Sequence, residues 1–204
     1  MDDPRICIIG AGSLSTSRIY PYVGAAGGRI VGVCDLDLEK AGRNARRFGG
    51  TPYADRGEML VSERPDAVIV CIGPAQHAEI AIETMHRGVP VYTEKPPAIS
   101  ATVALEVART AKQTGVLCVT AFKKRYAACY ERAREWIDSH PIGERLSLAV
   151  KRSSGHYGNG DDPRSQLLLD FGIHGIDLIG YLFGDARRVF AFSKDRDAYA
   201  VSLE

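Results

Sequence analysis

The sequence has no marked excess of charge of either sign. Its 204 residues include 26 lysines and arginines against 25 aspartates and glutamates, so the net charge is +1 at neutral pH. Proteins that bind nucleic acid or an anionic membrane surface by electrostatic attraction display a clear basic excess. We therefore expect neither a nucleic-acid partner nor a membrane partner.

Long apolar runs are missing as well. The longest of them, such as residues 67–73, have the length of a strand, whereas a membrane-spanning helix needs about 20 apolar residues. The chain starts with the acidic segment Met1-Asp2-Asp3-Pro4, which is unlike the basic start of a secretory signal peptide. With 45% hydrophobic and 25% charged residues, the composition is that of an ordinary globular protein, and we expect a cytoplasmic location.

Cysteine is scarce, and no disulfide or metal pattern is present. The five cysteines are widely spaced and form no C-x-x-C pair, which favours reduced thiols as small core residues. His86, His140 and His156 lack the spacing of metal ligands, so we predict no metal site. A Walker loop and a G-x-S-x-G elbow are also absent from the sequence.

Strand-length apolar runs alternate with helix-length segments over residues 1–121. This alternation, with apolar strands, predicts a Rossmann domain, which is a doubly wound parallel sheet covered by helices on both faces. The predicted strands are 5–9, 29–34, 66–72, 89–93 and 116–121, and the predicted helices are 13–24, 38–48, 78–85 and 100–114.

The alternation ends after residue 121, and residues 122–204 predict a second domain. Its elements are helices at 126–139 and 166–183 and strands at 146–151, 188–192 and 198–203, with a glycine-containing loop at 153–164. They predict a partial C-terminal α/β domain with an open, mostly antiparallel sheet. Because this sheet breaks off at Glu204, we expect the second domain to be incomplete in this sequence.

The segment Gly10-Ala11-Gly12-Ser13-Leu14-Ser15 directly follows the first predicted strand. In a dinucleotide-binding turn, the first glycine permits a tight bend and the second lets the backbone approach a pyrophosphate at the start of the next helix. Asp35 ends the second predicted strand, where an acidic side chain accepts hydrogen bonds from ribose hydroxyls and repels a 2′-phosphate. The pattern predicts dinucleotide binding, with NAD favoured over NADP. The alternative is a plain strand–helix turn beside an acidic strand end.

The tetrapeptide Glu94-Lys95-Pro96-Pro97 follows another predicted strand. Ligands of open α/β sheets gather beyond the carboxyl ends of the strands, so Lys95 is expected where a cation meets a substrate oxygen. The two prolines restrict the backbone directly after it. The alternative is an ordinary solvated lysine.

A polar stripe runs along the late, otherwise apolar helix. Asp170, His174, Asp177 and Tyr181 follow one another at helical spacing. A histidine titrates near neutral pH and an aspartate one turn earlier can orient it, so Asp170 and His174 are candidates for proton transfer. The alternative is a structural His–Asp pair, and we expect Asp177 and Tyr181 to serve structure or the adjoining Rossmann surface.

Together these motifs resemble those of the Gfo/Idh/MocA oxidoreductases, a family that includes glucose–fructose oxidoreductase and inositol dehydrogenase. The resemblance rests on the G-x-G turn at 10–12, Asp35, Pro74, His77, Glu94-Lys95-Pro96 and the segment LDFGIHGIDL at 169–178. An E-K-P tripeptide followed by D-x-x-x-H-x-x-D is a specific combination. The match covers essentially the whole chain in family order, although members of the family are usually longer.

The resemblance implies an NAD-dependent dehydrogenase or reductase that acts on CH–OH groups. It implies hydride transfer between nicotinamide and a secondary alcohol or ketone of a sugar, a cyclitol or a related polyol. The family's catalytic lysine, aspartate and histidine correspond to Lys95, Asp170 and His174. We expect His174 to take the hydroxyl proton, Lys95 to stabilise the alkoxide, and Asp170 to hydrogen-bond His174 or a substrate hydroxyl.

The resemblance also implies ligand contacts and an assembly. The expected cofactor contacts are Gly10, Gly12, Ser13, Leu14, Asp35, Cys71, Ile72, Pro74, His77, Glu94 and Lys95, and the expected substrate contacts are Arg125, His156 and Tyr157. A homo-oligomer formed through the C-terminal sheet is expected as well. Two alternative functions on the same scaffold are a catalytically silent NAD-binding regulator and an NAD-dependent glycosidase; the intact Lys95, Asp170 and His174 speak against the regulator.

Overall fold

The computed structural model describes residues 3–141, 143, 168–193 and 199–203. The chain divides into two compact units, Met1–Ala121 and Phe122–Glu204. The predicted strand at 146–151 and the predicted loop at 153–164, with His156 and Tyr157, lie outside the described residues.

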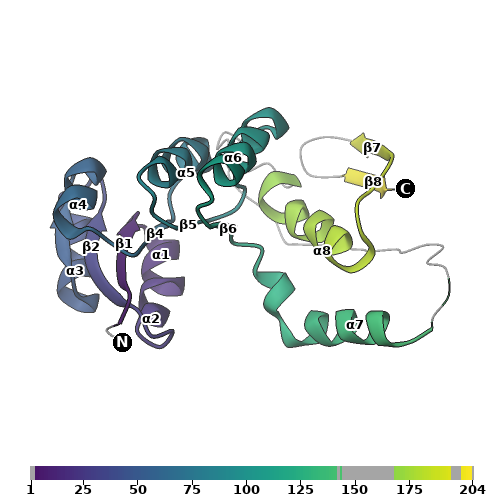
Figure 1. The fold of residues 1–204 in the computed structure, drawn as a ribbon, viewed down its shortest axis with the longest axis horizontal. Helices are drawn as coiled ribbons and strands as arrows, with labels where there is room; N and C mark the ends of the chain where they lie inside the picture. Colours follow the sequence, from purple (N-terminus) through teal and green to yellow (C-terminus); the bar gives the residue numbers. More distant parts are fainter. Residues whose placement is uncertain (1–2, 142, 144–167, 194–198, 204) are drawn as a thin grey trace. The chain divides into compact units, whose positions relative to one another are not determined.

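A six-stranded, fully parallel sheet forms the centre of the first unit (Figure 1). The strand order is β3-β2-β1-β4-β5-β6, which is the order of the doubly wound dinucleotide-binding fold. The predicted Rossmann fold is therefore confirmed. The strands are β1 (Arg5–Ile9), β2 (Arg29–Cys34), β3 (Thr51–Tyr53), β4 (Ala67–Val70), β5 (Val91–Thr93) and β6 (Cys118–Thr120).

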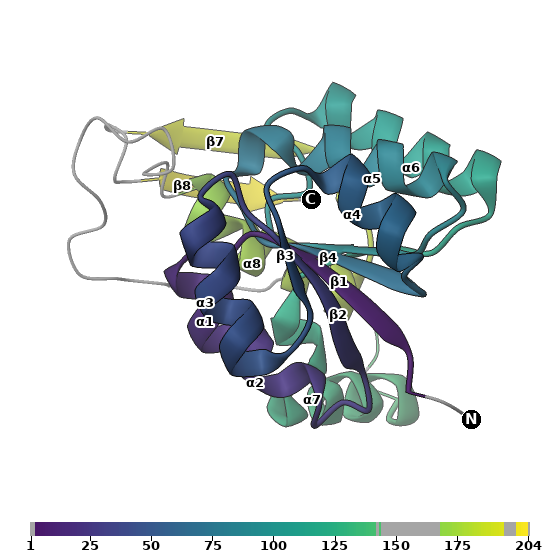
Figure 2. The same cartoon turned by 90° about the vertical axis from the view of Figure 1, so that its left-hand side faces the viewer.

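Helices cover both faces of this sheet, because successive strand residues point to opposite sides and both sides are apolar. Figure 2 shows α1, α2 and α3 on one face and α4, α5 and α6 on the other. One core joins Ile8 and Val33 to Tyr20, whereas the other joins Cys7 and Val68 to residues of α4 and α5. The helices are α1 (Ser13–Arg18), α2 (Tyr20–Val23), α3 (Leu38–Phe48), α4 (Arg56–Glu63), α5 (His77–His86) and α6 (Ala101–Thr114), with a 3₁₀ turn, η1 (Pro74–Gln76), before α5.

Local sequence signals place most helix ends. Ser100 caps α6 by accepting a hydrogen bond from the amide of Val103, as a serine at this position favours, and Gly115 in the left-handed conformation ends the helix. The single helix predicted at 13–24 is divided at Ile19 into α1 and α2. The short elements β3 and α4 were not predicted from the sequence. The carboxylate of Asp55 caps α4.

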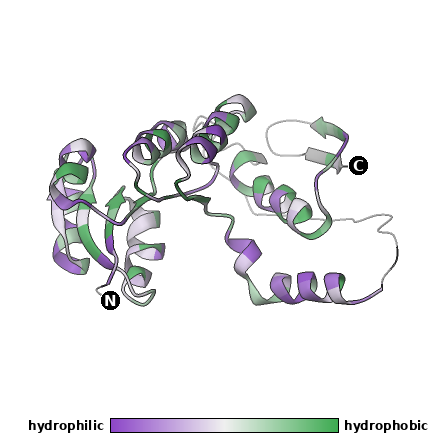
Figure 3. Cartoon of the chain, in the orientation of Figure 1, coloured by the Kyte–Doolittle hydropathy of each residue, from purple (hydrophilic) through white to green (hydrophobic). Residues whose placement is uncertain are grey.

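The second unit contains two helices and an antiparallel strand pair among its described residues. The α-helices are α7 (Ala128–Ser139) and α8 (Ile173–Phe183), and the paired strands are β7 (Val189–Ser193) and β8 (Tyr199–Leu203). A 3₁₀ turn η2 (Lys123–Tyr126) precedes α7, and a π-helical turn η4 (Leu168–Gly172) precedes α8. Figure 3 shows that α7 is mostly hydrophilic, whereas α8 is mostly hydrophobic. In the described part of the chain, no helix is long and apolar enough to cross a membrane.

The buried thiols of the first unit generate a testable pH dependence. Burial raises the pKa of Cys7 and Cys71 to about 12 and that of Cys34 to about 11, from an ordinary 9.0. The unfolded chain therefore releases these protons at lower pH than the folded chain, so stability is lost as pH rises above 9.0. We expect the free energy of unfolding, measured by urea titration with a reductant present, to fall between pH 9 and pH 11.

Two variants isolate the thiol contribution. Cys34→Ala removes one buried thiol and should make the alkaline fall shallower. Cys129→Ser changes an exposed thiol, whose surroundings differ little between the folded and unfolded chain, and should leave the fall unchanged. An unchanged pH dependence in Cys34→Ala would show that this thiol does not contribute.

Candidate cofactor and catalytic sites

The parallel sheet brings the predicted cofactor residues of the first unit to one edge. Hydrogen bonds between backbone groups continue the sheet one residue beyond the strands: Gly10 N to Cys34 O at 2.7 Å, Cys71 N to Ile9 O at 2.8 Å and Glu94 N to Val70 O at 2.8 Å. The residues directly after β1, β2, β4 and β5 consequently lie in a row across the carboxyl edge. This is the edge at which open α/β sheets bind ligands.

The two glycines of the turn after β1 have different roles. Gly10 has φ +108°, and a Cβ atom at this position would lie 2.0 Å from the carbonyl oxygen of Cys71. The fold itself therefore requires glycine at position 10. A Cβ atom on Gly12 would meet none of the described atoms within 4 Å, so the described part of the fold does not require glycine there. The bare backbone at Gly12 instead leaves room for a group from outside the protein.

Asp35 is fixed at the end of β2 by two backbone amides. Its Oδ2 accepts a hydrogen bond from Ala11 N at 2.7 Å, and its Oδ1 accepts one from Asp37 N at 2.9 Å. A carboxylate has about four acceptor positions, so two amides leave room for further donors. The partly exposed side chain is thus held rigidly beside the glycine turn and can still accept hydrogen bonds from a ligand hydroxyl.

Buried side chains behind the turn hold its shape. Ser15 is fully buried and donates a hydrogen bond to Gly12 O at 3.0 Å, so it takes the place of a third glycine without opening the packing. The hydroxyl of Tyr20 donates to Gly10 O at 3.1 Å, and burial raises its pKa, which keeps it protonated as a donor. Ser13 and Leu14, in contrast, are exposed on the outside of the turn.

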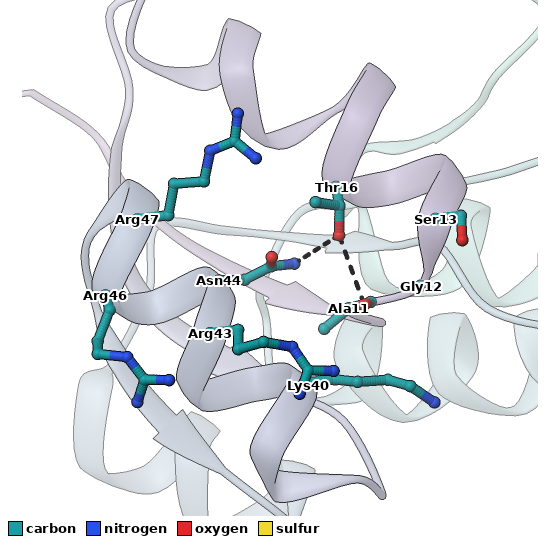
Figure 4. Close-up of a pocket in the computed structure, with 9 residues that line it drawn as sticks. All are labelled: Ala11, Gly12, Ser13, Thr16, Lys40, Arg43, Asn44, Arg46 and Arg47. Atoms are coloured by element: carbon teal, nitrogen blue, oxygen red, sulfur yellow. Dashed lines mark hydrogen bonds between the residues drawn. The ribbon is translucent and has the colours of Figure 1, made fainter.

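A basic cavity of about 640 Å³ lies beside the turn (Figure 4). Asn44 donates to the hydroxyl of Thr16 at 2.8 Å, and that hydroxyl donates to Ala11 O, so α3 is tied to the turn. This cavity was not predicted from the sequence, because its shape depends on how α3 packs beside the turn. The lining residues are Ala11, Gly12, Ser13, Thr16, Lys40, Arg43, Asn44, Arg46 and Arg47.

His77 joins two loops of the same edge. Its Nδ1 lies 2.8 Å from Pro96 O and its Nε2 lies 3.2 Å from Ile72 O, and the side chain is only 1% exposed. The ring thus braces the segment after β4 against the segment that carries Lys95. Both ring nitrogens face protein carbonyls. His77 therefore shapes the cofactor edge by holding the two loops together.

The remaining predicted cofactor residues of this edge lie on the same two loops. Cys71 is 7% exposed with a protonated thiol, and Ile72 and Pro74 are partly exposed beside it. Glu94 and Lys95 are partly exposed, and the carboxylate of Glu94 accepts a hydrogen bond from the backbone amide of Lys95 at 3.1 Å. The Lys95–Pro96 peptide bond is cis.

Helix α8 carries the polar stripe in the second unit. His174 is buried, with 7% exposure, in the first turn of α8, and its ring meets that of Phe122 edge-on with centroids 6.5 Å apart. The sequence predicted Asp170 to lie in the same α-helix as His174. Asp170 instead lies in the π-helical turn η4, which precedes α8. Such single π turns inside helices occur frequently at functional sites.

The side chain of Arg125 is 42% exposed, and its predicted contact with substrate stays a prediction. It forms an ion pair with Asp177, whose carboxylate raises the pKa of Arg125. The structure thus places Arg125 in a structural contact with α8. Among the described residues, no group of His, Cys, Asp and Glu side chains has the arrangement of a metal site.

Comparison with known proteins identifies the family. Residues 4–122 match the GFO_IDH_MocA family, described as an oxidoreductase family with an NAD-binding Rossmann fold. The chain belongs to this oxidoreductase family. The resemblance found in the motifs is thereby confirmed, and the first unit is an NAD-binding domain.

Relatives in this oxidoreductase family are dehydrogenases of sugars and inositols. The chain is 30% identical over 189 residues to D-glucoside 3-dehydrogenase of Escherichia coli, with 88% of this chain and 54% of the relative covered. It is also 30% identical over 184 residues to inositol 2-dehydrogenase 2 of Saccharopolyspora erythraea, with the same coverage. The chain therefore spans about half the length of the curated relatives that it matches.

Solved structures of the family share the fold. A dehydrogenase from Chromobacterium violaceum has a TM-score of 0.80 at 28% identity, with 98% of this chain and 61% of that chain covered. The WlbA dehydrogenase of the same organism, in complex with NADH and UDP-GlcNAcA, also has a TM-score of 0.80, at 20% identity, with 94% and 59% covered.

The two glycines of the turn predict two different losses. Gly10→Ala should unfold or strongly destabilise the first unit, because its Cβ atom would collide with the Cys71 carbonyl. Gly12→Ala should lower the melting temperature far less than Gly10→Ala, because it alters only the N-cap of α1, and we expect it to weaken NAD binding through the added Cβ atom beside the pyrophosphate. Melting curves with and without NAD measure both effects. A Gly12→Ala protein with unchanged NAD affinity would contradict the ligand role of Gly12.

Proposed function

We propose that the complete protein oxidises a secondary hydroxyl of a sugar or cyclitol, or reduces the corresponding ketone, with NAD as the cofactor. The observation that carries this proposal is the row formed by the glycine turn, Asp35 and the Lys95 loop at one sheet edge of an NAD-binding family member. The names of the relatives, a glucoside 3-dehydrogenase and an inositol 2-dehydrogenase, support a ring hydroxyl as the group that reacts.

The residues of this edge fit NAD. The open space at Gly12 and the exposed Ser13 and Leu14 suit a pyrophosphate beside the turn, and Asp35 has acceptor positions left for the ribose hydroxyls. Lys40 and Arg43 add positive charge to the neighbouring cavity, which suits the negative charge of the pyrophosphate. The chemistry that bound NAD would supply is that of a hydride acceptor for the carbon that carries the hydroxyl.

The side chains of the protein supply the proton chemistry. His174 takes the hydroxyl proton on a ring nitrogen, since imidazole is the side chain whose unperturbed proton affinity suits neutral pH. The ammonium Nζ of Lys95 stabilises the negative charge that develops on the same oxygen. Asp170, four residues before His174, orients the imidazole or accepts a hydrogen bond from a neighbouring substrate hydroxyl.

Asp35 should set the cofactor preference. A 2′-phosphate would bring negative charge next to a carboxylate that two backbone amides hold in place. We expect NAD to bind at least ~10-fold more tightly than NADP, a ratio that corresponds to about 1.4 kcal/mol. Calorimetric titration with each dinucleotide measures this ratio, and equal or tighter NADP binding would refute the role given to Asp35.

The catalytic assignment predicts large losses of turnover. His174→Ala should lower kcat by ~10²–10⁴-fold, which is the usual contribution of a general acid or base. Lys95→Ala should lose a comparable factor through lost charge stabilisation. The double variant should lose much less than the product of the two factors, because both side chains act on one oxygen. NADH absorbance during a screen of sugars and polyols, with the full-length protein, gives the activity.

Melting temperature and NAD affinity are the controls for these variants. His174→Ala should bind NAD normally, since His174 is not among the residues proposed to hold NAD. Asp170→Asn should cost less turnover than His174→Ala if it orients the imidazole, and should raise KM if it holds a substrate hydroxyl. A destabilised but fully active His174→Ala protein would refute the mechanism, and release of free sugar without net NADH would favour a glycosidase.

A further inference from the structure

Arg125 connects the start of the second unit to helix α8. Its Nε donates to both carboxylate oxygens of Asp177, at 2.9 and 3.1 Å, and its Nη2 donates to Oδ1 as well. The side chain of Asp177 is only 6% exposed. Because a guanidinium is planar and its donors are fixed, this pairing determines both the distance and the angle between η2 and α8.

Two aromatic rings flank the guanidinium and connect it to His174. The Arg125 Cζ atom lies 5.8 Å from the ring centroid of Phe122 and 5.6 Å from that of Tyr181. The same Phe122 ring meets the imidazole of His174 edge-on. Arg125 and His174 therefore share one aromatic neighbour, and Asp177 follows His174 by about one helical turn on α8.

We propose that Arg125 and Asp177 are positioning residues that fix the imidazole of His174 by clamping α8 against η2. The inference rests on the proposed function, in which His174 takes the substrate proton. His174 and Asp177 belong to one helix, so a rotation or slide of α8 that follows loss of the clamp also displaces the imidazole. Loss of the clamp further removes the packing that holds Phe122 against His174. A displacement of about 1 Å at a reacting group can cost on the order of 10²-fold in rate.

Arg134 of α7 offers a matched control that also contacts α8. It lies 5.6 Å from the ring of Tyr181, donates to the Tyr181 carbonyl oxygen and pairs with Asp138. It thus ties α8 to α7 through Tyr181, near the C-terminal end of α8. Loss of Arg134 should reduce the stability of α8 packing without releasing Asp177 or Phe122.

The test compares Arg125→Ala with Arg134→Ala in the full-length protein. We expect Arg125→Ala to lower kcat by about 10²-fold with unchanged NAD affinity, whereas Arg134→Ala should lower the melting temperature with unchanged kcat. Arg125→Lys, which keeps one charged donor, should recover part of the lost kcat. The double variant Arg125→Ala/Asp177→Ala should lose no more kcat than the single variant, because the two residues act as one unit. The NMR signal of the His174 ring should shift in Arg125→Ala and stay in place in Arg134→Ala.

The outcomes separate this inference from the proposed function. If His174→Ala is inactive while Arg125→Ala keeps its kcat and its His174 ring signal, the positioning role is wrong and the mechanism stands. If His174→Ala is fully active, the mechanism is wrong, and a shifted ring signal in Arg125→Ala still supports the clamp. Equal losses of kcat in Arg125→Ala and Arg134→Ala, in proportion to their stability, would also overturn the inference, because any weakening of α8 would then suffice.

Discussion

The hydrogen-bond ladder of the parallel sheet determines where the candidate residues directly after its strands lie. Parallel strands all end at the same edge, and the ladder here continues one residue beyond β1, β4 and β5. Residues far apart in the sequence, such as Gly10, Cys71 and Glu94, are therefore neighbours through backbone geometry alone. Side chains then refine this edge: the carboxylate of Asp35 holds the glycine turn, and the ring of His77 holds the loop that carries Lys95.

The glycine turn separates what folding requires from what a ligand requires. Gly10 is demanded by the fold, because any side chain would collide with the backbone after β4, and Tyr20 and Ser15 close the turn from behind. A Cβ atom on Gly12, the N-cap of α1, would contact none of the described residues. A residue that costs backbone entropy without a packing reason marks a surface shaped for something that binds there. The basic cavity on the adjoining helix α3 gives that surface the charge expected for a phosphate ligand.

Periodicity was sufficient to predict the long, apolar elements of the first unit. The strand at 29–34 and the helix at 38–48 have the predicted bounds, because apolar spacing and a following Gly49 determine them locally. The strand β3 and the helix α4 escaped prediction: β3 is three residues long, and α4 buries only Met59 and Leu60. The basic cavity escaped too, because its shape depends on how α3 packs beside the turn, which no local pattern encodes.

In the polar stripe of α8, tertiary contacts give different roles to residues that share the predicted helical spacing. Helical spacing places the four polar residues on one side of a helix. In the structure they differ in backbone geometry and in the residues that they contact. Asp170 lies in a π turn, whose i→i+5 hydrogen bonding is wider than that of an α-helix, so its direction relative to His174 is not that of an ideal helix. Asp177 is committed to Arg125, a partner 52 residues earlier that the sequence could not reveal. His174 is the one imidazole of the stripe, and it is buried. A buried imidazole on an apolar helix depends on its neighbours for its orientation. The clamp formed by Arg125 and Asp177 acts on this orientation indirectly, through the ring of Phe122 and through the backbone of α8.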